Sequence, residues 1–257
     1  MLNTIIHGDC LEVIEQIPDN YIDLTITSPP YNVDLGNNKY NKNPYDLYND
    51  NKEHGDYLDW LTEIFGKIYG KTKSGGRCVI NIGDGQNGRV PTHSDIIQLM
   101  THQLKWIPMV TIIWDKNSVS GRTSWGSFNS PSSPSFPTPF EYILGFAKEY
   151  RKIQWKGVSD LNRDDFVKWS LAKWVFTGEN PKRVKHPAPF PMELPLRCIK
   201  MFSWVDSVVY DPFVGSGTTA IACLENNRSF IGSDISEEYC EIARQRISEH
   251  KQQLTLI

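Results

Sequence analysis

The sequence lacks the features of several large protein classes. Its five cysteines are odd in number and no two form a C-x-x-C pair, which argues against a disulfide framework and against a zinc site. No apolar run approaches the roughly 18 residues of a membrane-spanning helix. No charged segment followed by an apolar run marks a signal peptide at the N-terminus. These absences predict a soluble, cytoplasmic protein with no membrane contact and no metal site.

Net charge is low, but the charge is unevenly distributed. The 257 residues carry a net charge of −3, whereas residues 71–200 hold 19 basic and 10 acidic side chains between two acidic ends. A basic segment of this kind could hold a polyanion such as nucleic acid. The alternative is a solvated, lysine-rich face with no partner.

Short apolar runs alternate with stretches of helical periodicity, a pattern typical of α/β proteins. The chain length suits one domain with a substantial core. The glycine pair Gly75-Gly76 is expected to break the chain before a strand. We expect strands over residues 22–27, 78–82, 110–114, 142–146, 207–210 and 229–231, and helices over residues 56–69, 94–104, 218–226 and 237–251.

Polar and basic stretches interrupt this alternation. Residues 33–55 form a long polar loop, residues 117–139 are rich in serine and proline, and residues 149–186 are basic. The last stretch carries three tryptophans, at least two of which are expected to pack a small core of their own. We therefore predict a single domain, residues 1–257, whose core comprises residues 1–116, 140–148 and 187–257, with insertions at about 117–139 and 149–186. The three tryptophans are Trp155, Trp169 and Trp174.

The segment Thr27-Ser28-Pro29-Pro30-Tyr31 directly follows an expected strand. Two consecutive prolines fix the backbone and remove two amide donors, which leaves rigidly aimed carbonyl groups. A rigid carbonyl, a serine oxygen and an aromatic ring together suit a planar amine such as the amino group of a nucleobase. The alternative is a turn that ends the strand and packs its tyrosine.

The segment Asp211–Ala220, with the sequence DPFVGSGTTA, follows a strand and opens a helix. Glycines in such a turn let backbone amides approach a ligand at the positive end of a helix. The segment lacks the lysine of a P-loop and the third glycine of a dinucleotide fingerprint. Asp234 lies 23 residues after Asp211, where an acidic side chain typically binds ribose hydroxyls. A nucleoside-containing cofactor is therefore expected, and an oxidoreductase that binds a nicotinamide cofactor at residues 215–217 remains an alternative.

Together, TSPPY and DPFVGSGTT resemble the S-adenosylmethionine-dependent DNA amino-methyltransferases, in the β-type order with SPPY first. Further resemblances are the acidic motif at residues 7–10, the segments 75–77, 113–116 and 185–191, and Leu194. The resemblance implies a Rossmann-like α/β fold with a mostly parallel seven-stranded sheet and a small inserted target-recognition region. It also implies S-adenosyl-L-methionine as the cofactor, bound by Asp9, Phe190, Asp211, Phe213, Gly215, Gly217, Thr218 and Asp234.

The same resemblance makes Ser28, Pro29, Pro30 and Tyr31 the catalytic residues. Acceptors at Ser28 and Pro29 would polarise the amine of a flipped base on which Tyr31 stacks, and we assign no strong general base. Serine in the first motif position is typical of cytosine-N4 enzymes, whereas aspartate is typical of adenine-N6 enzymes, so cytosine N4 is preferred and adenine N6 is the alternative. Methylation at carbon 5 is argued against because no cysteine follows a proline. A non-catalytic DNA-binding relative is the remaining alternative.

Double-stranded DNA is the expected partner, held by the basic middle of the chain. A restriction–modification setting would add a cognate restriction endonuclease, and an orphan enzyme would not. Both a monomer and a homodimer are compatible with the sequence. The candidate DNA-binding residues are Arg122, Lys156, Arg163, Lys173, Lys182 and Arg183, of which Arg122 and Arg163 are candidate readers of guanine.

Overall fold

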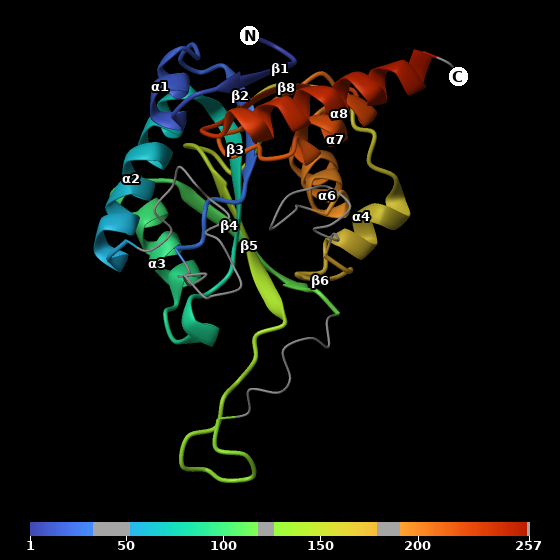
Figure 1. Cartoon of the computed structure of the whole chain (residues 1–257). Coiled ribbons are helices and arrows are strands. Elements are labelled where there is room, and N and C mark those ends of the chain that lie inside the picture. The colour runs from blue at the N-terminus through green and yellow to red at the C-terminus, as the bar shows by residue number, and fades with distance from the viewer. Residues whose placement is uncertain (33–51, 118–125, 179–190, 256–257) are drawn as a thin grey trace.

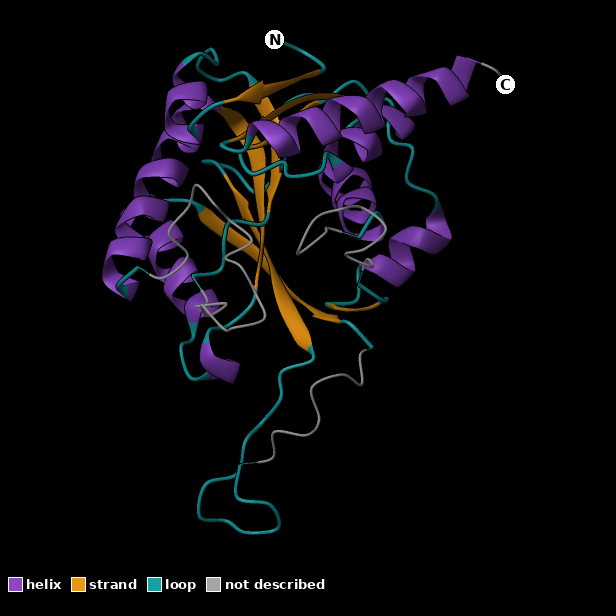
Figure 2. Ribbon diagram, viewed as in Figure 1, coloured by secondary structure: helices purple, strands orange, loops and turns teal. Residues whose placement is uncertain are grey.

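The computed structural model describes residues 1–32, 52–117, 126–178 and 191–255. Within these residues, eight strands form one sheet in the order β1-β8-β7-β2-β3-β5-β4-β6 (Figures 1 and 2). Strand β5 is antiparallel to both of its neighbours, and every other pair is parallel. The strands are β1 (Thr4–His7), β2 (Ile22–Thr27), β3 (Thr72–Ile82), β4 (Ile107–Asp115), β5 (Phe140–Ala147), β6 (Lys173–Val175), β7 (Val208–Asp211) and β8 (Ser229–Asp234).

Helices cover both faces of this sheet, with α1, α2 and α3 on one side and α4, α6, α7 and α8 on the other (Figure 1). Two apolar clusters fill the two interfaces, and neighbouring residues of β3 alternate between them. Burial on both faces explains why the central strands read as continuous apolar runs. The helices are α1 (Cys10–Glu15), α2 (His54–Lys71), η1 (Gln86–Gly88), α3 (Thr92–Gln98), η2 (Leu99–Gln103), α4 (Arg163–Trp169), α6 (Glu193–Phe202), α7 (Thr218–Glu225) and α8 (Glu237–Thr255).

The predicted strands and helices all occur, with two differences in the sheet. Its strands number eight rather than seven, because residues 173–175 of the predicted second insertion pair with β4 as β6. The pair Gly75-Gly76 lies inside β3 rather than before it. The pairing jumps from Ile22–Thr72 to Leu24–Arg77, so the glycines sit in a bulge, where Gly75 adopts a φ of +81°. Glycine here permits a bulge instead of ending the strand.

The expectation of a separate tryptophan core in residues 149–186 is wrong. Trp169 and Trp174 are buried in the same apolar cluster as the residues of α6 and β2. The guanidinium of Arg197, on α6, lies 5.5 Å from the Trp169 ring centroid and 5.2 Å from that of Trp174. Trp155 is half-buried at the other end of the segment, where Lys73 lies over its ring.

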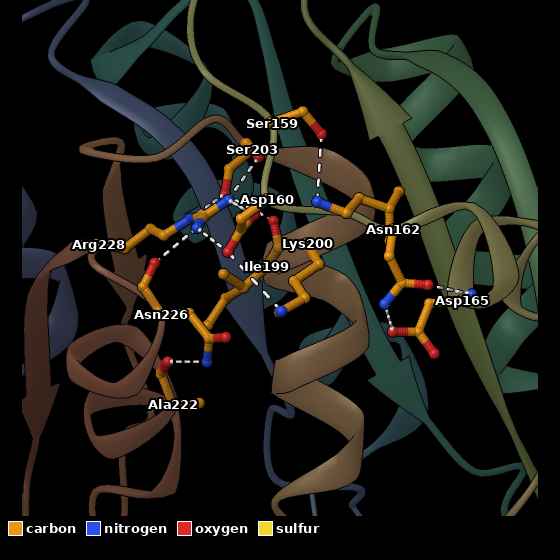
Figure 3. Close-up of polar contacts among 11 residues, drawn as sticks. Ser159, Asp160, Asn162, Asp165, Ile199, Lys200, Ser203, Ala222, Asn226 and Arg228 are labelled. Carbon is orange, nitrogen blue, oxygen red and sulfur yellow. Dashed lines mark hydrogen bonds and ion pairs between the residues drawn. The ribbon is translucent and has the colours of Figure 1, made fainter.

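A buried ion pair ties the same segment to the core (Figure 3). The guanidinium of Arg228, which is completely buried, donates to both carboxylate oxygens of Asp160, at 2.8 and 3.0 Å. It also donates to the backbone carbonyls of Ser203, at the end of α6, and Asn226, after α7. Burial is the largest single effect and opposes ionisation of Asp160, but the hydrogen bonds and the charge of Arg228, together with the charge of Lys200, outweigh it and lower the pKa of that carboxyl. Residues near Asp160 are therefore fixed on the core.

The described part of the other predicted insertion protrudes from the body of the molecule between β4 and β5 (Figure 1). Residues 126–139 form a hairpin-like turn, closed by a bridge between Gly126 and Pro134 and a hydrogen bond from the Ser127 amide to the Ser133 carbonyl. Phe128 and Phe136 are 75% and 72% exposed there. The division into core and insertions stays a prediction.

Candidate functional site

Four parallel strands bring the predicted motifs to one edge of the sheet. β1, β8, β7 and β2 are neighbours in that order, and the register pairs His7 with Asp234 and Asp211 with Gly232. The carboxyl ends of these strands therefore carry the Asp9 motif, Asp234, the glycine segment and the SPPY segment side by side. The helices after β7 and β2 lie on opposite faces (Figure 1), so the two main motifs flank the point where the winding reverses. Ligands of open α/β sheets bind in the crevice at such a point.

Asp211 joins the two main motifs by hydrogen bonds. Its Oδ1 accepts from the Thr27 hydroxyl at 2.9 Å and from the Phe213 amide at 3.1 Å, and its Oδ2 accepts from the Thr219 hydroxyl at 2.6 Å. Burial raises the pKa of Asp211 to about 6, although these hydrogen bonds oppose the rise. The carboxylate thus connects the end of β2 to the turn after β7 and to the start of α7.

The glycine turn is fastened to the end of β8. The Gly215 amide donates to Asp234 Oδ2 at 2.9 Å, and the Ser236 amide donates to Oδ1 of the same carboxylate at 2.9 Å. Gly217 precedes α7 with a φ of +82°, and a Cβ there would lie 2.9 Å from the Ala243 Cβ. Burial raises the pKa of Asp234. The turn therefore needs glycine both for its backbone conformation and for its packing.

The segments after β1 and β7 supply the rest of the predicted cofactor site. Asp9 precedes α1 and its Oδ1 accepts from the Leu11 amide at 2.8 Å. Thr218 is the first residue of α7, and Phe213 is half-buried with its ring centroid 5.6 Å from that of Trp60 on α2. Two carboxylates, a turn with two glycines and an aromatic ring at one edge fit a nucleoside with hydroxyl and amino groups. Phe190 lies outside the described residues.

The SPPY segment is held by a cluster of polar side chains. Ser28 Oγ donates to the Tyr31 hydroxyl at 3.1 Å, and that hydroxyl donates to Glu141 Oε2 at 2.8 Å. Asn81 Nδ2 donates to the Tyr31 hydroxyl at 2.6 Å and to Glu141 Oε2 at 2.7 Å. Lys116 forms an ion pair with the other oxygen of Glu141. Burial, followed by the charge of Glu141, raises the pKa of Tyr31 well above its usual range.

The two proline carbonyls differ, which corrects the expectation that both are free. The Tyr57 hydroxyl, from α2, donates to the Pro30 carbonyl at 2.7 Å. No donor among residues 1–32, 52–117, 126–178 and 191–255 reaches the Pro29 carbonyl, and Pro29 itself is buried. Only the Pro29 carbonyl and Ser28 thus remain as candidate acceptors for a substrate amine.

Three of the predicted DNA-binding residues lie in the described part of the chain, and all three are exposed. The side chain of Arg163 is 90% exposed at the start of α4, and Lys156 is exposed in the segment before it. Lys173, on β6, lies 3.4 Å from Asp115, which partly neutralises it. Arg122, Lys182 and Arg183 lie outside the described residues.

Sequence reasoning missed four residues of this site. Asn81 is the one polar residue in the apolar run 78–82 of β3, Glu141 is the one charged residue of β5, and Tyr57 is one aromatic residue of helix α2. Lys116 belongs to the segment 113–116, whose only signal in the sequence is its family resemblance. A charged residue in an otherwise apolar strand was the available signal, since Glu141 is 8% exposed and needs a partner.

A family model described as DNA methylase, of the N6/N4 type, matches residues 22–245. The chain belongs to this family. Its members are S-adenosylmethionine-dependent DNA amino-methyltransferases, so the predicted family and cofactor are confirmed. The Type II methyltransferase M.MjaVI of Methanocaldococcus jannaschii is 35% identical over 183 residues, which cover 70% of this chain and 89% of that protein. M.MjaI of the same organism is 30% identical over 275 residues, covering 95% and 90%.

Solved structures agree with the predicted Rossmann-like methyltransferase fold. A putative DNA modification methylase from Thermus thermophilus, complexed with S-adenosyl-L-methionine, has a TM-score of 0.74 and 28% identity, covering 96% of this chain and 93% of that one. The cytosine-N4-specific PvuII DNA methyltransferase has a TM-score of 0.69 at 21% identity, covering 93% and 84%, and supports the fold alone. Among the described residues, no helix of this amino-methyltransferase is long and apolar enough to cross a membrane.

Proposed function

We propose that this DNA amino-methyltransferase methylates N4 of cytosine in double-stranded DNA. The observation that carries the proposal is that the Ser28 hydroxyl and the Pro29 carbonyl are neighbours at the end of β2. Both groups are uncharged acceptors, and they lie beside the glycine turn of the neighbouring strand. Serine at this motif position supports cytosine over adenine, and adenine N6 remains the alternative.

S-adenosylmethionine supplies an activated methyl group when it is bound. Asp9 and Asp234 suit the adenine and ribose ends of this cofactor, because their strands are adjacent and their carboxylates reach the same edge. Gly215, Gly217 and Thr218 supply the turn against which the cofactor would lie, and Phe213 an aromatic face. Asp211 is buried and accepts from three donors of the two motifs, whereas Asp234 is half-buried, so we assign Asp211 the shaping of the turn. Phe190 is retained as a candidate from the sequence.

Ser28 and Pro29 act on the substrate amine by accepting its two hydrogens. An amine conjugated to the base ring is a weak nucleophile, and hydrogen bonds to its hydrogens draw electron density back to nitrogen. Tyr31 offers its ring to stack on the base. Because extrusion of a base from the duplex costs a few kcal/mol, these contacts must offset that cost.

DNA would approach the edge that carries SPPY. The hairpin-like turn of residues 126–139 projects from this same edge, since β4 ends there and β5 begins there, and we propose that it contacts DNA. The predicted DNA contacts stay proposals: Arg122, Lys156, Arg163, Lys173, Lys182 and Arg183. The similarity to Type II methyltransferases supports a cognate restriction endonuclease as a partner. A monomer and a homodimer both remain compatible with this function.

Nucleoside mass spectrometry tests the proposal. Plasmid DNA treated with the protein and S-adenosylmethionine should contain N4-methylcytosine, whereas N6-methyladenine would refute the choice of base. Ser28→Ala should retain cofactor affinity in isothermal titration and lose about 100-fold in turnover, the typical cost of one preorganised electrostatic contact. Ser248→Ala, on the exposed face of α8, is the matched control and should leave turnover unchanged. Equal turnover of the Ser28→Ala variant would refute the role of Ser28.

A further inference from the structure

The hydrogen bonds of the Tyr31 hydroxyl all run from donor to acceptor toward Glu141. A tyrosine hydroxyl has a single hydrogen and accepts through its oxygen. Asn81 Nδ2 donates to that oxygen, and so does Ser28 Oγ, which leaves the tyrosine hydrogen for Glu141. Ser28, Tyr31 and Glu141 therefore form a chain in which every hydroxyl hydrogen points away from the SPPY backbone and toward a carboxylate.

Glu141 is well placed to end such a chain. It lies on β5, 110 residues from Tyr31 in the sequence, and its side chain is 10% exposed. Of the described residues, two titratable groups face it, Tyr31 from the segment after β2 and Lys116 from the end of β4, and the amide of Asn81 faces it from β3. Among the residues that the structure describes, Lys116 alone supplies a cation to Glu141, so this carboxylate has one counter-charge there.

Tyr31 can accept a proton and release another, but it does not remain as a charged phenolate. Burial raises the pKa of its hydroxyl well above the usual range, so the neutral phenol is the stable form at neutral pH. Gly83 also lies close to the ring, because a Cβ on Gly83 would lie 3.2 Å from its Cε2. The hydroxyl is thus fixed between its donors and Glu141 while the ring remains in the SPPY segment.

We propose that Ser28 and Tyr31 relay the proton released by the substrate amine to Glu141. This inference rests on the proposed function, because it concerns the same amine. The N–H bond of the amine breaks as its nitrogen takes the methyl group, and the sulfonium donor leaves as a neutral thioether. Ser28 Oγ takes the amine proton and passes its own hydrogen to Tyr31, whose hydrogen passes to Glu141. The positive charge of the sulfonium and the negative charge of Glu141 are both cancelled.

Two variants interrupt the relay at different points. Tyr31→Phe keeps the stacking ring and removes the middle hydroxyl, whereas Glu141→Gln keeps the shape and removes the proton acceptor. Each variant should lower the single-turnover rate of methyl transfer about 100-fold, the lower end of general acid–base contributions. The double variant should be no slower than the slower single variant, because both changes disable one unit. Tyr150→Phe and Glu241→Gln, both exposed, are the matched controls.

Further measurements separate a relay from a structural role. Isothermal titration should give unchanged S-adenosylmethionine affinity for both variants. In the isolated protein, the infrared carboxylate band that Glu141→Gln abolishes should shift in Tyr31→Phe, because Glu141 loses a donor.

Each outcome decides one of the two proposals. A wild-type rate in Tyr31→Phe, or no infrared shift, overturns the relay and leaves the proposed function standing. N6-methyladenine as the wild-type product overturns the choice of cytosine, and the comparison of variants still decides the relay. No methylated nucleoside at all overturns the proposed function together with the relay. If Glu141→Gln does not fold, Tyr31→Phe decides alone.

Discussion

Removal of the Asp160 carboxylate should destabilise the protein by about 3 kcal/mol. Loss of one partner of a buried ion pair typically costs 3–5 kcal/mol, because the other charge is left buried without a counter-ion. Arg228 is completely buried, but each of its two terminal nitrogens keeps a backbone carbonyl acceptor, from Asn226 or Ser203. The side chain of Asp160 is 28% exposed, so water can partly replace it. Both facts favour the lower end of the range.

Urea denaturation of Asp160→Ala and the wild type measures this cost as the difference in midpoint multiplied by the slope. Asp164→Ala removes a carboxylate that is 94% exposed from its pair with Arg163, and it should cost less than about 1 kcal/mol. A cost for Asp160→Ala as small as that of this control would refute the conclusion that the Asp160–Arg228 ion pair anchors the second predicted insertion.

The pH dependence provides an independent check of the same contact. Burial raises the pKa of Asp160 in the folded protein, but the hydrogen bonds and charge of Arg228, with the charge of Lys200, lower it overall. The stabilising effect of this contact is therefore present above the pKa of the unfolded chain, near 3.9, and is lost as the pH falls through the lower, folded value. The stability difference between wild type and Asp160→Ala should shrink on acidification below about pH 4. A difference that grows on acidification would contradict this sign.

Three further predictions concern the site itself. Tyr57→Phe removes the donor to the Pro30 carbonyl and should cost about 1 kcal/mol in urea denaturation while leaving cofactor affinity unchanged. Gly217→Ala introduces a left-handed alanine that clashes with Ala243, so it should cost more than about 1 kcal/mol and weaken S-adenosylmethionine binding in isothermal titration. Because the pKa of Asp211 is raised to about 6, its contribution to stability is fully present below about pH 4 and lost as the pH rises through 6. Asp211→Asn should remove this dependence, so the stability difference between the two proteins should change between pH 4 and 7; a constant difference would contradict it.

The sequence predicts those parts of the site that come from strand ends. Ser28, Asp211 and Asp234 each follow a short apolar run, and parallel strands in one sheet must end at the same edge. Local pattern and topology together are enough to bring these residues close. The adjacent register of β1 and β8 places Asp9 next to Asp234 for the same reason.

The same reasoning does not predict contacts between residues that lie within strands. Glu141 reaches Tyr31 only because the antiparallel strand β5 lies beside β3, a pairing between segments about 60 residues apart. No local motif marks that contact. The prediction for the glycine pair of β3 failed for a related reason. A bulge and a turn before a strand have the same composition and differ only in whether a neighbouring strand is present.

The two main motifs depend on each other through one hydrogen bond. Thr27 immediately precedes Ser28, and its hydroxyl donates to the same Asp211 that receives the Phe213 amide and the Thr219 hydroxyl. Any shift of the glycine turn is therefore transmitted to the backbone that carries the substrate acceptors. Methyl transfer needs the amine and the methyl donor to lie within a few tenths of an ångström of a productive geometry, and misplacement by about 1 Å can cost 100-fold. A buried carboxylate with a raised pKa is unfavourable for stability by itself, so we infer that the role of Asp211 is to hold the two halves of the site in register.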